Sequence, residues 1–277
     1  MKTETIYSKN AIYQKIEVLK TNRNKRYKYS EFFVEGVRNI NEAIKNKWHI
    51  CTFIYTKEKP LSNWAKDILS TIPTDINYEL TANLMEDLSN KEDTSELIAI
   101  VRMREDNFEQ FHFSDNPIVA LFDRPSNKGN LGTIIRSCDA LGVEGLIITG
   151  HAVDLYDPDV IVSSMGSFFN VPVIRLTENE QMEDFISIMK KKYKNFKTIG
   201  TTAHKQNPIY SIDLTTPILF LIGNETDGLC KAFKECCDEQ VTIPMVEGSS
   251  ASSFNVGCAA TVMFYEAVRQ REGKNIG

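Results

Sequence analysis

The chain has 277 residues, of which 42% are hydrophobic and 25% are charged, as is typical of a globular protein with one or two domains. A net charge of −5 argues against nucleic-acid binding over the whole surface. No apolar run is as long as a membrane span, and the N-terminal residues lack the layout of a signal peptide. The six cysteines form no CxxC pair and show no zinc-like spacing with the four histidines. We therefore expect reduced thiols, a cytoplasmic location and no metal site.

The positive charge is concentrated near the N-terminus. Between Lys9 and Lys28 the chain has seven basic residues and one acid, Glu17, and the run ends with Tyr27 and Tyr29. Basic residues with interleaved aromatics suit phosphate contact and base stacking, although a solvated helix face explains the charge equally well. For a second basic cluster, Lys190 to Lys197, plain solvation is the favoured interpretation.

The first hundred residues alternate between helical and strand-like patterns. Helices are expected at 8–20, 37–44, 64–69 and 82–88, and strands at 32–36, 50–55, 76–80 and 97–101. This alternation predicts a small α/β domain over residues 1–104, followed by a polar linker at 105–116.

A second domain is expected over residues 117–277. Strands are predicted at 119–123, 145–149, 171–176, 198–202, 218–222 and 241–243, with helices at 130–141, 179–192 and 253–270. Apolar strands with helical crossovers predict a parallel sheet covered on both faces. Ligands bind beyond the carboxyl ends of such strands, where three loops are expected, at 124–130, 223–229 and 244–253.

The first loop opens a helix with an arginine on it. Leu131, Ile134, Ile135 and Cys138 give this helix a buried face, Asn130 can cap it, and Gly142 can end it. Arg136 lies off the buried face and leans back toward the Gly-rich turn, which makes it a candidate anion or substrate ligand. An ordinary surface pair between Arg136 and Asp139 is the alternative.

The second loop has a glycine at each end. Gly223 would let a ligand approach the backbone, Gly228 allows a sharp turn, and Glu225 between them can accept hydrogen bonds. An ordinary turn before a helix is the alternative.

The third loop leads into the last predicted helix. Ser252 or Ser253 would cap that helix, and Asn255 would fall in its first turn. A capped terminal helix without any ligand is the alternative. No GxGxxG, GxxxxGK[ST] or GxSxG motif is present, which argues against the usual dinucleotide-binding, P-loop and hydrolase sites.

Taken together and in order, the three loops resemble the motifs of the SpoU family of RNA ribose methyltransferases, within the SPOUT superfamily. The resemblance covers roughly residues 117–272 and rests on Asn130-Leu-Gly-Thr-Ile-Ile-Arg136, Gly223-Asn-Glu225-x-x-Gly228-Leu229, and Ile243-Pro-Met245 with Ser253-Phe-Asn255. Ser164-Met-Gly-Ser-Phe-Phe-Asn-Val-Pro172 is similar to a further family segment. Val34-Glu35-Gly36-x-Arg38 resembles the ribosomal-protein-like RNA-binding domain that many members carry.

The resemblance implies a SPOUT domain with a deep trefoil knot, S-adenosylmethionine as cofactor, and a homodimer joined through the knotted domains. It implies these site residues: for catalysis Arg136, Asn130, Glu225, Ser253 and Asn255; for the cofactor Gly223, Ile243, Phe254, Met245 and Thr202; and for RNA Lys15, Arg23, Lys25, Arg26, Lys28 and Arg38. Arg136 would stabilise the developing alkoxide and grip a phosphate, since an arginine is normally protonated.

The implied activity is methylation of a ribose 2′-hydroxyl in structured RNA, with 23S ribosomal RNA favoured. A tRNA substrate and a non-catalytic RNA-binding dimer are the alternatives. The sequence departs from the family pattern at Phe254, Gly257 and Val162, where leucine, serine and arginine are usual. These departures leave every implied catalytic residue in place and bear on substrate choice.

Overall fold

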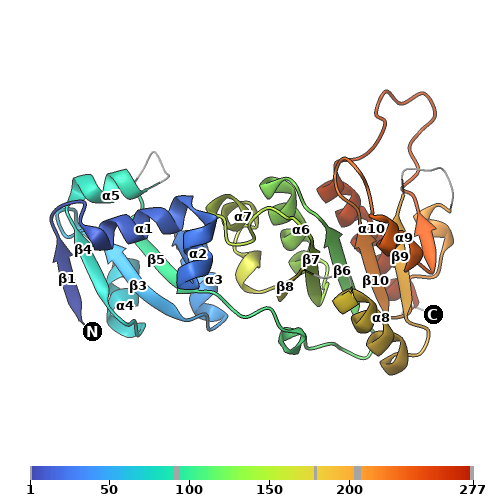
Figure 1. Cartoon of the computed structure of the whole chain (residues 1–277), viewed down its shortest axis with the longest axis horizontal. Coiled ribbons are helices and arrows are strands. Elements are labelled where there is room, and N and C mark those ends of the chain that lie inside the picture. The colour runs from blue at the N-terminus through green and yellow to red at the C-terminus, as the bar shows by residue number, and fades with distance from the viewer. Residues whose placement is uncertain (1, 90–93, 178–179, 203–206, 275–277) are drawn as a thin grey trace. The chain divides into compact units, whose positions relative to one another are not determined.

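The computed structural model describes residues 2–89, 94–177, 180–202 and 207–274 (Figure 1). By contacts the chain divides into two compact units. Unit 1 comprises residues 1–104 and Asp154–Asn170, and unit 2 comprises Glu105–Val153 and residues 171–277. Among the described helices, none combines the length and apolar character that a bilayer crossing requires.

Unit 1 is built on a mixed sheet of five strands in the order β1-β4-β3-β5-β2. The strands are β1 (Thr3–Ile6), β2 (Glu31–Glu35), β3 (Ile50–Tyr55), β4 (Asn77–Leu80) and β5 (Leu97–Arg102), and β5 runs antiparallel to both of its neighbours. The helices are α1 (Ala11–Thr21), α2 (Arg23–Tyr29), α3 (Val37–Lys45), α4 (Asn63–Thr71) and α5 (Ala82–Leu88). Tyr13, Ile16 and Leu19 of α1 enter the core of this unit, as their helical spacing predicts.

Several elements of unit 1 were not predicted from the sequence, and for two of them, β1 and α2, the physical reason is plain. Strand β1 is a short edge strand with one buried residue, Ile6, so it shows no apolar alternation. Helix α2 is almost entirely polar; its start is fixed by Asn22, whose side chain accepts a hydrogen bond from the backbone of Lys25.

A stretch from the middle of the chain belongs to unit 1. It contains α7 (Pro158–Ser163) and a 3-10 turn, η2 (Ser167–Phe169), and its Tyr156, Phe168 and Phe169 form an aromatic cluster with Phe32 and Trp48. The indole nitrogen of Trp48 donates a 2.9 Å hydrogen bond to the carbonyl of Phe169. Residues 154–170 are therefore held by aromatic burial as well as by hydrogen bonds.

Unit 2 is built on a six-stranded parallel sheet in the order β11-β9-β10-β6-β7-β8. Its strands are β6 (Ile118–Asp123), β7 (Gly145–Thr149), β8 (Val173–Leu176), β9 (Lys197–Thr201), β10 (Ile218–Ile222) and β11 (Glu239–Val241). Its helices are α6 (Lys128–Ala140), α8 (Glu180–Lys192), α9 (Lys231–Glu235) and α10 (Val256–Lys274), with 3-10 turns η1 (Phe108–Gln110) and η3 (Ile209–Ser211). The α/β fold with a parallel sheet is as expected from the sequence, although residue 179 of the predicted helix lies outside the described residues.

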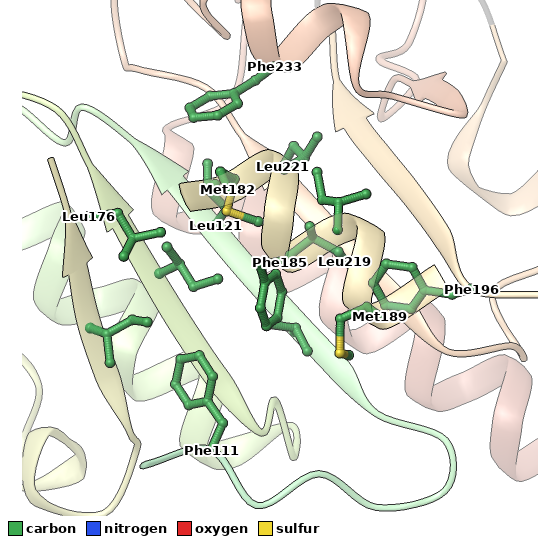
Figure 2. Close-up of a cluster of buried hydrophobic side chains, with 14 of the residues drawn as sticks. Phe111, Leu121, Leu176, Met182, Phe185, Met189, Phe196, Leu219, Leu221 and Phe233 are labelled. Atoms are coloured by element: carbon green, nitrogen blue, oxygen red, sulfur yellow. The ribbon is translucent and has the colours of Figure 1, made fainter. Parts of the chain in front are cut away.

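Both faces of this sheet are covered. On one face, Met182, Phe185 and Met189 of α8 pack on Leu121 of β6 and Leu219 of β10 (Figure 2). On the other face lie α6 and α10, where the rings of Phe220 and Phe264 are 5.8 Å apart. Burial on both faces explains why the strands read as continuous apolar runs.

The stretch predicted as a linker packs into unit 2. Phe111 is buried in the core shown in Figure 2, Phe108 and Phe113 pack against it, and the ring of Phe108 stacks on Phe185 at 4.8 Å. Phe111 also fills the space beside Gly145, where a Cβ would lie 2.8 Å from its ring. The scattered phenylalanines of this polar stretch are therefore core residues.

Candidate active site

Two of the predicted loops leave the sheet side by side. Strands β6 and β10 are neighbours in parallel register, with Ile222 opposite Phe122, so the loops that follow Asp123 and Ile222 start at the same edge. This is the carboxyl edge, where α/β sheets bind ligands.

Asp123 and Arg124 join these loops at their base. Asp123 is 1% exposed and accepts hydrogen bonds from Arg124, from the hydroxyl of Thr149 at 3.2 Å, and from the backbone of Cys230 at 2.8 Å. Arg124 has a left-handed backbone with a φ of 49°, and its guanidinium also donates to the carbonyl of Gly228. The hydrogen bond to Asp123 raises the pKa of Arg124, so the ion pair is stable at neutral pH. This pair was not predicted from the sequence, where its signal is an acid at a strand end followed by Arg-Pro.

Glu225 ties the second loop to the first. Its carboxylate accepts hydrogen bonds from the backbone and hydroxyl of Ser126 at 3.1 and 2.7 Å, from the backbone of Asn127 at 3.2 Å, and from the amide of Asn130 at 3.1 Å. Partial burial raises the pKa of Glu225, but these hydrogen bonds outweigh it and leave the pKa below its ordinary value. Glu225 is therefore ionised and engaged on both oxygens, which suits holding the loop better than accepting a proton.

The third loop joins the same network through Asn255. The side-chain nitrogen of Asn255 donates to the side-chain oxygen of Asn130 at 3.0 Å, while its oxygen accepts from the backbone of Gly257 at 2.9 Å. Glu225, Asn130 and Asn255 thus form one hydrogen-bonded chain that links all three loops.

Two predicted caps were wrong. Asn255, immediately before α10, caps that helix in place of Ser252 or Ser253, and the helix begins at Val256. Asn127 caps α6 by accepting from the backbone of Asn130 at 2.9 Å, which leaves the Asn130 side chain for Glu225 and Asn255. An asparagine caps each of the two helices. Several residues before each helix could serve as the cap, and the loop geometry decides which one does.

Arg136 is exposed on α6, beyond the network. In the described part of the chain it has no hydrogen-bond or ion-pair partner, so the surface pair with Asp139 does not form. Arg136 lines an open groove of about 480 Å³ between α6 and α10, with Val262 and Tyr265 on the opposite wall. The structure therefore brings together Asn130, Glu225 and Asn255, but it joins neither Arg136 nor the exposed Ser253 to them by a hydrogen bond among the described residues.

The expected cofactor residues lie at the carboxyl ends of three adjacent strands. Thr202 follows β9, Gly223 follows β10, and Ile243 lies just beyond β11. A Cβ on Gly223 would lie 2.5 Å from the backbone of Gly228 and Leu229, so this position accepts only glycine without a shift of the loop. The apolar side chains of Met245 and Phe254 are 39% and 45% exposed. Exposed apolar side chains of this kind fit a ligand with a flat, partly apolar ring such as adenine.

The expected RNA residues lie in unit 1 and divide into two kinds. Lys25, Lys28, Arg23 and Arg38 are partly or fully exposed, and Lys15 pairs with Glu31 at 2.7 Å. Arg26 is different, because it is 1% exposed and its guanidinium lies 2.7 Å from Asp154. The expectation that Arg26 contacts RNA is therefore wrong for this structure, since a buried, paired guanidinium has no surface to offer.

One cluster in unit 1 has the residue types of a metal site, although the sequence spacing gave no sign of it. Ligand atoms of His49, Cys51 and Asp75 all lie within 4.8 Å of one another. Burial, however, raises the pKa of the Cys51 thiol to about 11, and Arg102 stands 3.8 Å from Asp75. A protonated thiol and a competing cation make this cluster a poor metal site.

Fold and site together define an α/β protein with a ligand-binding edge on a parallel sheet and a separate unit that carries the basic run Lys9–Lys28. Residues 117–265 match the SpoU rRNA Methylase family, and residues 10–99 match the SpoU L30e-like domain. The chain belongs to the SpoU rRNA methylase family.

Its relatives include a 23S rRNA (uridine(2479)-2′-O)-methyltransferase of Streptomyces viridochromogenes, 40% identical over 267 residues that cover 96% of this chain and 92% of that protein. The crystal structure of the SpoU methyltransferase AviRb from Streptomyces viridochromogenes with AdoMet has a TM-score of 0.89 at 40% identity, covering 95% of this chain and 98% of that one. The 23S rRNA (guanosine(2553)-2′-O)-methyltransferase RlmP of Bacillus subtilis is 24% identical over 248 residues, or 88% of this chain and 90% of that protein.

Proposed function

We propose that this protein transfers the methyl group of S-adenosylmethionine to a ribose 2′-hydroxyl in 23S ribosomal RNA. The observation that carries the proposal is the hydrogen-bonded chain Glu225–Asn130–Asn255, which brings the three family motifs together at the carboxyl edge of the sheet. The 40% identical relative is named for this reaction and matches the chain across both units. A ribosomal substrate is favoured over tRNA because the similarity to this relative extends through unit 1, which carries the basic run Lys9–Lys28.

The cofactor would be held at the ends of β9, β10 and β11. Its adenine and ribose would contact the backbone at Gly223, Ile243 and Phe254, with Met245 and Thr202 beside them. The AviRb crystal structure with AdoMet bound, at 40% identity, supports S-adenosylmethionine as the cofactor. The bound cofactor supplies a methyl group on a sulfonium, which is already activated, so the proposed reaction needs no metal ion.

The protein's own part in the reaction is to orient the ribose and to stabilise charge. Arg136 would grip a phosphate of the target nucleotide and stabilise the alkoxide that develops on the 2′-oxygen, because an arginine stays protonated at neutral pH. Asn130, Asn255 and Ser253 would position the hydroxyl, and Glu225 would fix the amide of Asn130. The proton leaves to a phosphate oxygen or to water.

RNA would be held by basic residues of unit 1 that are partly or fully exposed. These are Lys15, Arg23, Lys25, Lys28 and Arg38. The ammonium of Lys15 lies over the ring of Tyr29 and the guanidinium of Arg23 over that of Tyr27, at 4.9 and 5.5 Å from the ring centroids. Cations stacked on tyrosines form a surface for phosphates and bases.

We further propose a homodimer joined through unit 2, with the C-terminal segment threaded through a knot. Support for the dimer comes from the groove between α6 and α10, where Tyr265 is 57% and Val262 39% exposed. Exposed apolar side chains beside a groove are typical of protein interfaces.

An RNA substrate and six free cysteines support a cytoplasmic location. The domain limits 1–104 and 117–277 are retained as sequence-based proposals, with 105–116 between them.

Labelled cofactor can test the reaction. The purified protein is mixed with S-adenosylmethionine carrying a labelled methyl group and with 23S rRNA or tRNA from cells that lack the enzyme. Label should appear in 23S rRNA, at one 2′-O-methylated ribose found by mass spectrometry of fragments. Label in tRNA alone would replace the proposed substrate, and no label in either RNA would refute the proposal.

A further inference from the structure

Unit 2 has a second polar pocket at the opposite edge of its sheet. An open pocket of about 560 Å³ lies where β6 and β10 begin and where α8 ends, and its lining includes Asp115, Asn116, Lys192, Tyr193, Lys194 and Thr216. The candidate active site lies at the other ends of β6 and β10. The two sites are separated by the length of a strand, about 17 Å for five residues.

Three side chains that line this pocket have buried oxygens without a hydrogen-bond partner. Over the described residues only five such atoms occur, and three of them are the oxygen of the Asn116 amide and the hydroxyls of Tyr193 and Thr216. Tyr193 is 8% exposed. Buried polar atoms without a partner are rare because each costs free energy, so three around one pocket indicate a polar ligand.

The charge around the pocket is positive. Lys192 and Lys194 are exposed and have no ion-pair partner in the described chain, whereas Lys190 and Lys197 of the same cluster pair with Asp238 and Glu239. Plain solvation, the interpretation favoured for this cluster from its sequence, therefore does not describe Lys190 and Lys197. Lys192 and Lys194 remain at the pocket as cations without an ion pair among the described residues.

A further cation lies beside the pocket. The guanidinium of Arg271 donates to the carbonyls of Asn116, Thr216 and Leu214, at 2.6, 2.7 and 3.2 Å. Burial lowers the pKa of Arg271, and no carboxylate within ion-pair distance neutralises it in the described residues. The pocket lining contains one acid, Asp115, and two lysines, and Arg271 adds a third positive charge beside it. An anionic ligand would therefore be favoured there.

We propose that this pocket binds one phosphate and the adjoining ribose of the RNA backbone, away from the nucleotide that is methylated. Lys192, Lys194 and the two hydroxyls can donate to phosphate oxygens. Asn116 uses its nitrogen to donate to the carbonyl of Thr215 at 2.9 Å, so its free oxygen is an acceptor, which suits a ribose 2′-hydroxyl. This proposal rests on the proposed function only in taking RNA as the ligand.

Salt dependence of RNA binding tests the pocket independently of methylation. A labelled 23S rRNA fragment is titrated with the full-length protein at several KCl concentrations and followed by fluorescence anisotropy. A plot of log K against log salt has a negative slope. In the Lys192→Ala/Lys194→Ala variant this slope should become shallower by about 1, because each phosphate contact contributes about 0.7–0.9 to its magnitude. A matched control, Lys231→Ala/Lys234→Ala on α9, should change it less. Equal loss in both variants, or none in the first, would overturn the proposal.

Two shape-preserving variants separate a ligand site from general charge. Tyr193→Phe and Thr216→Val should each weaken RNA binding about tenfold or more, as expected for one lost hydrogen bond to a charged group. Wild-type affinity in both would overturn the proposal.

RNA with 2′-deoxyribose at the contacted position should bind more weakly to wild type than unmodified RNA does, and Asn116→Leu should abolish this difference. If the protein binds RNA through the pocket yet methylates none, the proposed function fails and the pocket stands.

Discussion

Arg26 and Arg136 show how differently two arginines of similar sequence character can be used. Arg26 lies in a basic run, yet it is buried in unit 1 and paired with Asp154. Arg136 has an acid three residues away, yet it is exposed on α6 without an ion pair among the described residues. The buried guanidinium supports the fold, and the exposed one remains available to a substrate. Partners distant in sequence decide which role each arginine has.

The largest expected effect belongs to Arg26. Arg26→Ala should lower the free energy of unfolding by about 3–5 kcal/mol, because it leaves the Asp154 carboxylate buried without its partner. Urea unfolding of the full-length protein measures this. The exposed neighbour Lys28→Ala serves as the control and should change stability by less than about 0.5 kcal/mol. A similar small change in both variants would show that the pair does not support the fold.

Arg136→Ala should leave stability and cofactor affinity almost unchanged while methyl transfer falls about 10²–10³-fold, as when one charge-stabilising donor is lost. Single-turnover kinetics and cofactor titration measure the two quantities separately. The Arg136→Lys variant keeps the positive charge but loses the planar fork of the guanidinium, so it should recover only part of the rate. Turnover at the wild-type rate in the alanine variant would remove Arg136 from the mechanism.

Gly223→Ala tests the glycine that lies between the two loops. The added Cβ meets backbone at 2.5 Å, so the loop must shift, and kcat/KM should fall by up to about 10²-fold. Gly273→Ala is the matched control, because a Cβ there meets nothing within 4 Å. Unchanged cofactor affinity and kcat/KM in Gly223→Ala would exclude this position from the site.

Glu225 gives a prediction about pH. Its pKa lies below the ordinary value, so its contribution to stability is present above that ordinary value and is lost as pH falls through the lowered pKa. Between pH 7 and pH 5, cofactor binding should therefore show no change due to Glu225. Glu225→Gln should lose about tenfold in turnover at neutral pH, because it replaces an ionised acceptor of several hydrogen bonds. A loss of binding by wild type between pH 7 and 5, absent from Glu225→Gln, would contradict the assignment.

The smallest effect is expected for Lys28, one of the basic residues of unit 1 proposed to bind RNA, and it concerns the salt dependence of RNA binding. Lys28→Ala should reduce the salt slope of RNA binding by about 1 and leave cofactor binding unchanged, whereas Lys66→Ala on α4 should do neither. Point variants are preferable to removing residues 1–104, because that deletion would expose Tyr156, Phe168 and Phe169, which pack on Phe32 and Trp48. Equal salt slopes in the two variants would remove Lys28 from the RNA surface.

Much of the fold could be predicted because its signals are local. The strands Ile50–Tyr55, Gly145–Thr149 and Ile218–Ile222 are apolar runs of strand length, and α5 has a regular apolar face. The polar helix α2 and the edge strand β1 have no such signal. Phe108 and Phe111 gave no signal of burial, because a polar stretch hides single aromatic residues that pack in or against the core only on folding.

By itself, the sequence determined the class of fold and the three loops that carry Asn130, Glu225 and Asn255, since motif order and apolar periodicity are properties of the chain. The tertiary structure decided which groups meet. It showed that Glu225 holds Asn130, that Asn255 rather than a serine caps α10, that Asp123 and Arg124 anchor the loops, and that Arg26 is buried. The physical reason is that hydrogen bonds and burial depend on neighbours in space, and these can be far apart in the chain: Arg26 and Asp154 are separated by 128 residues.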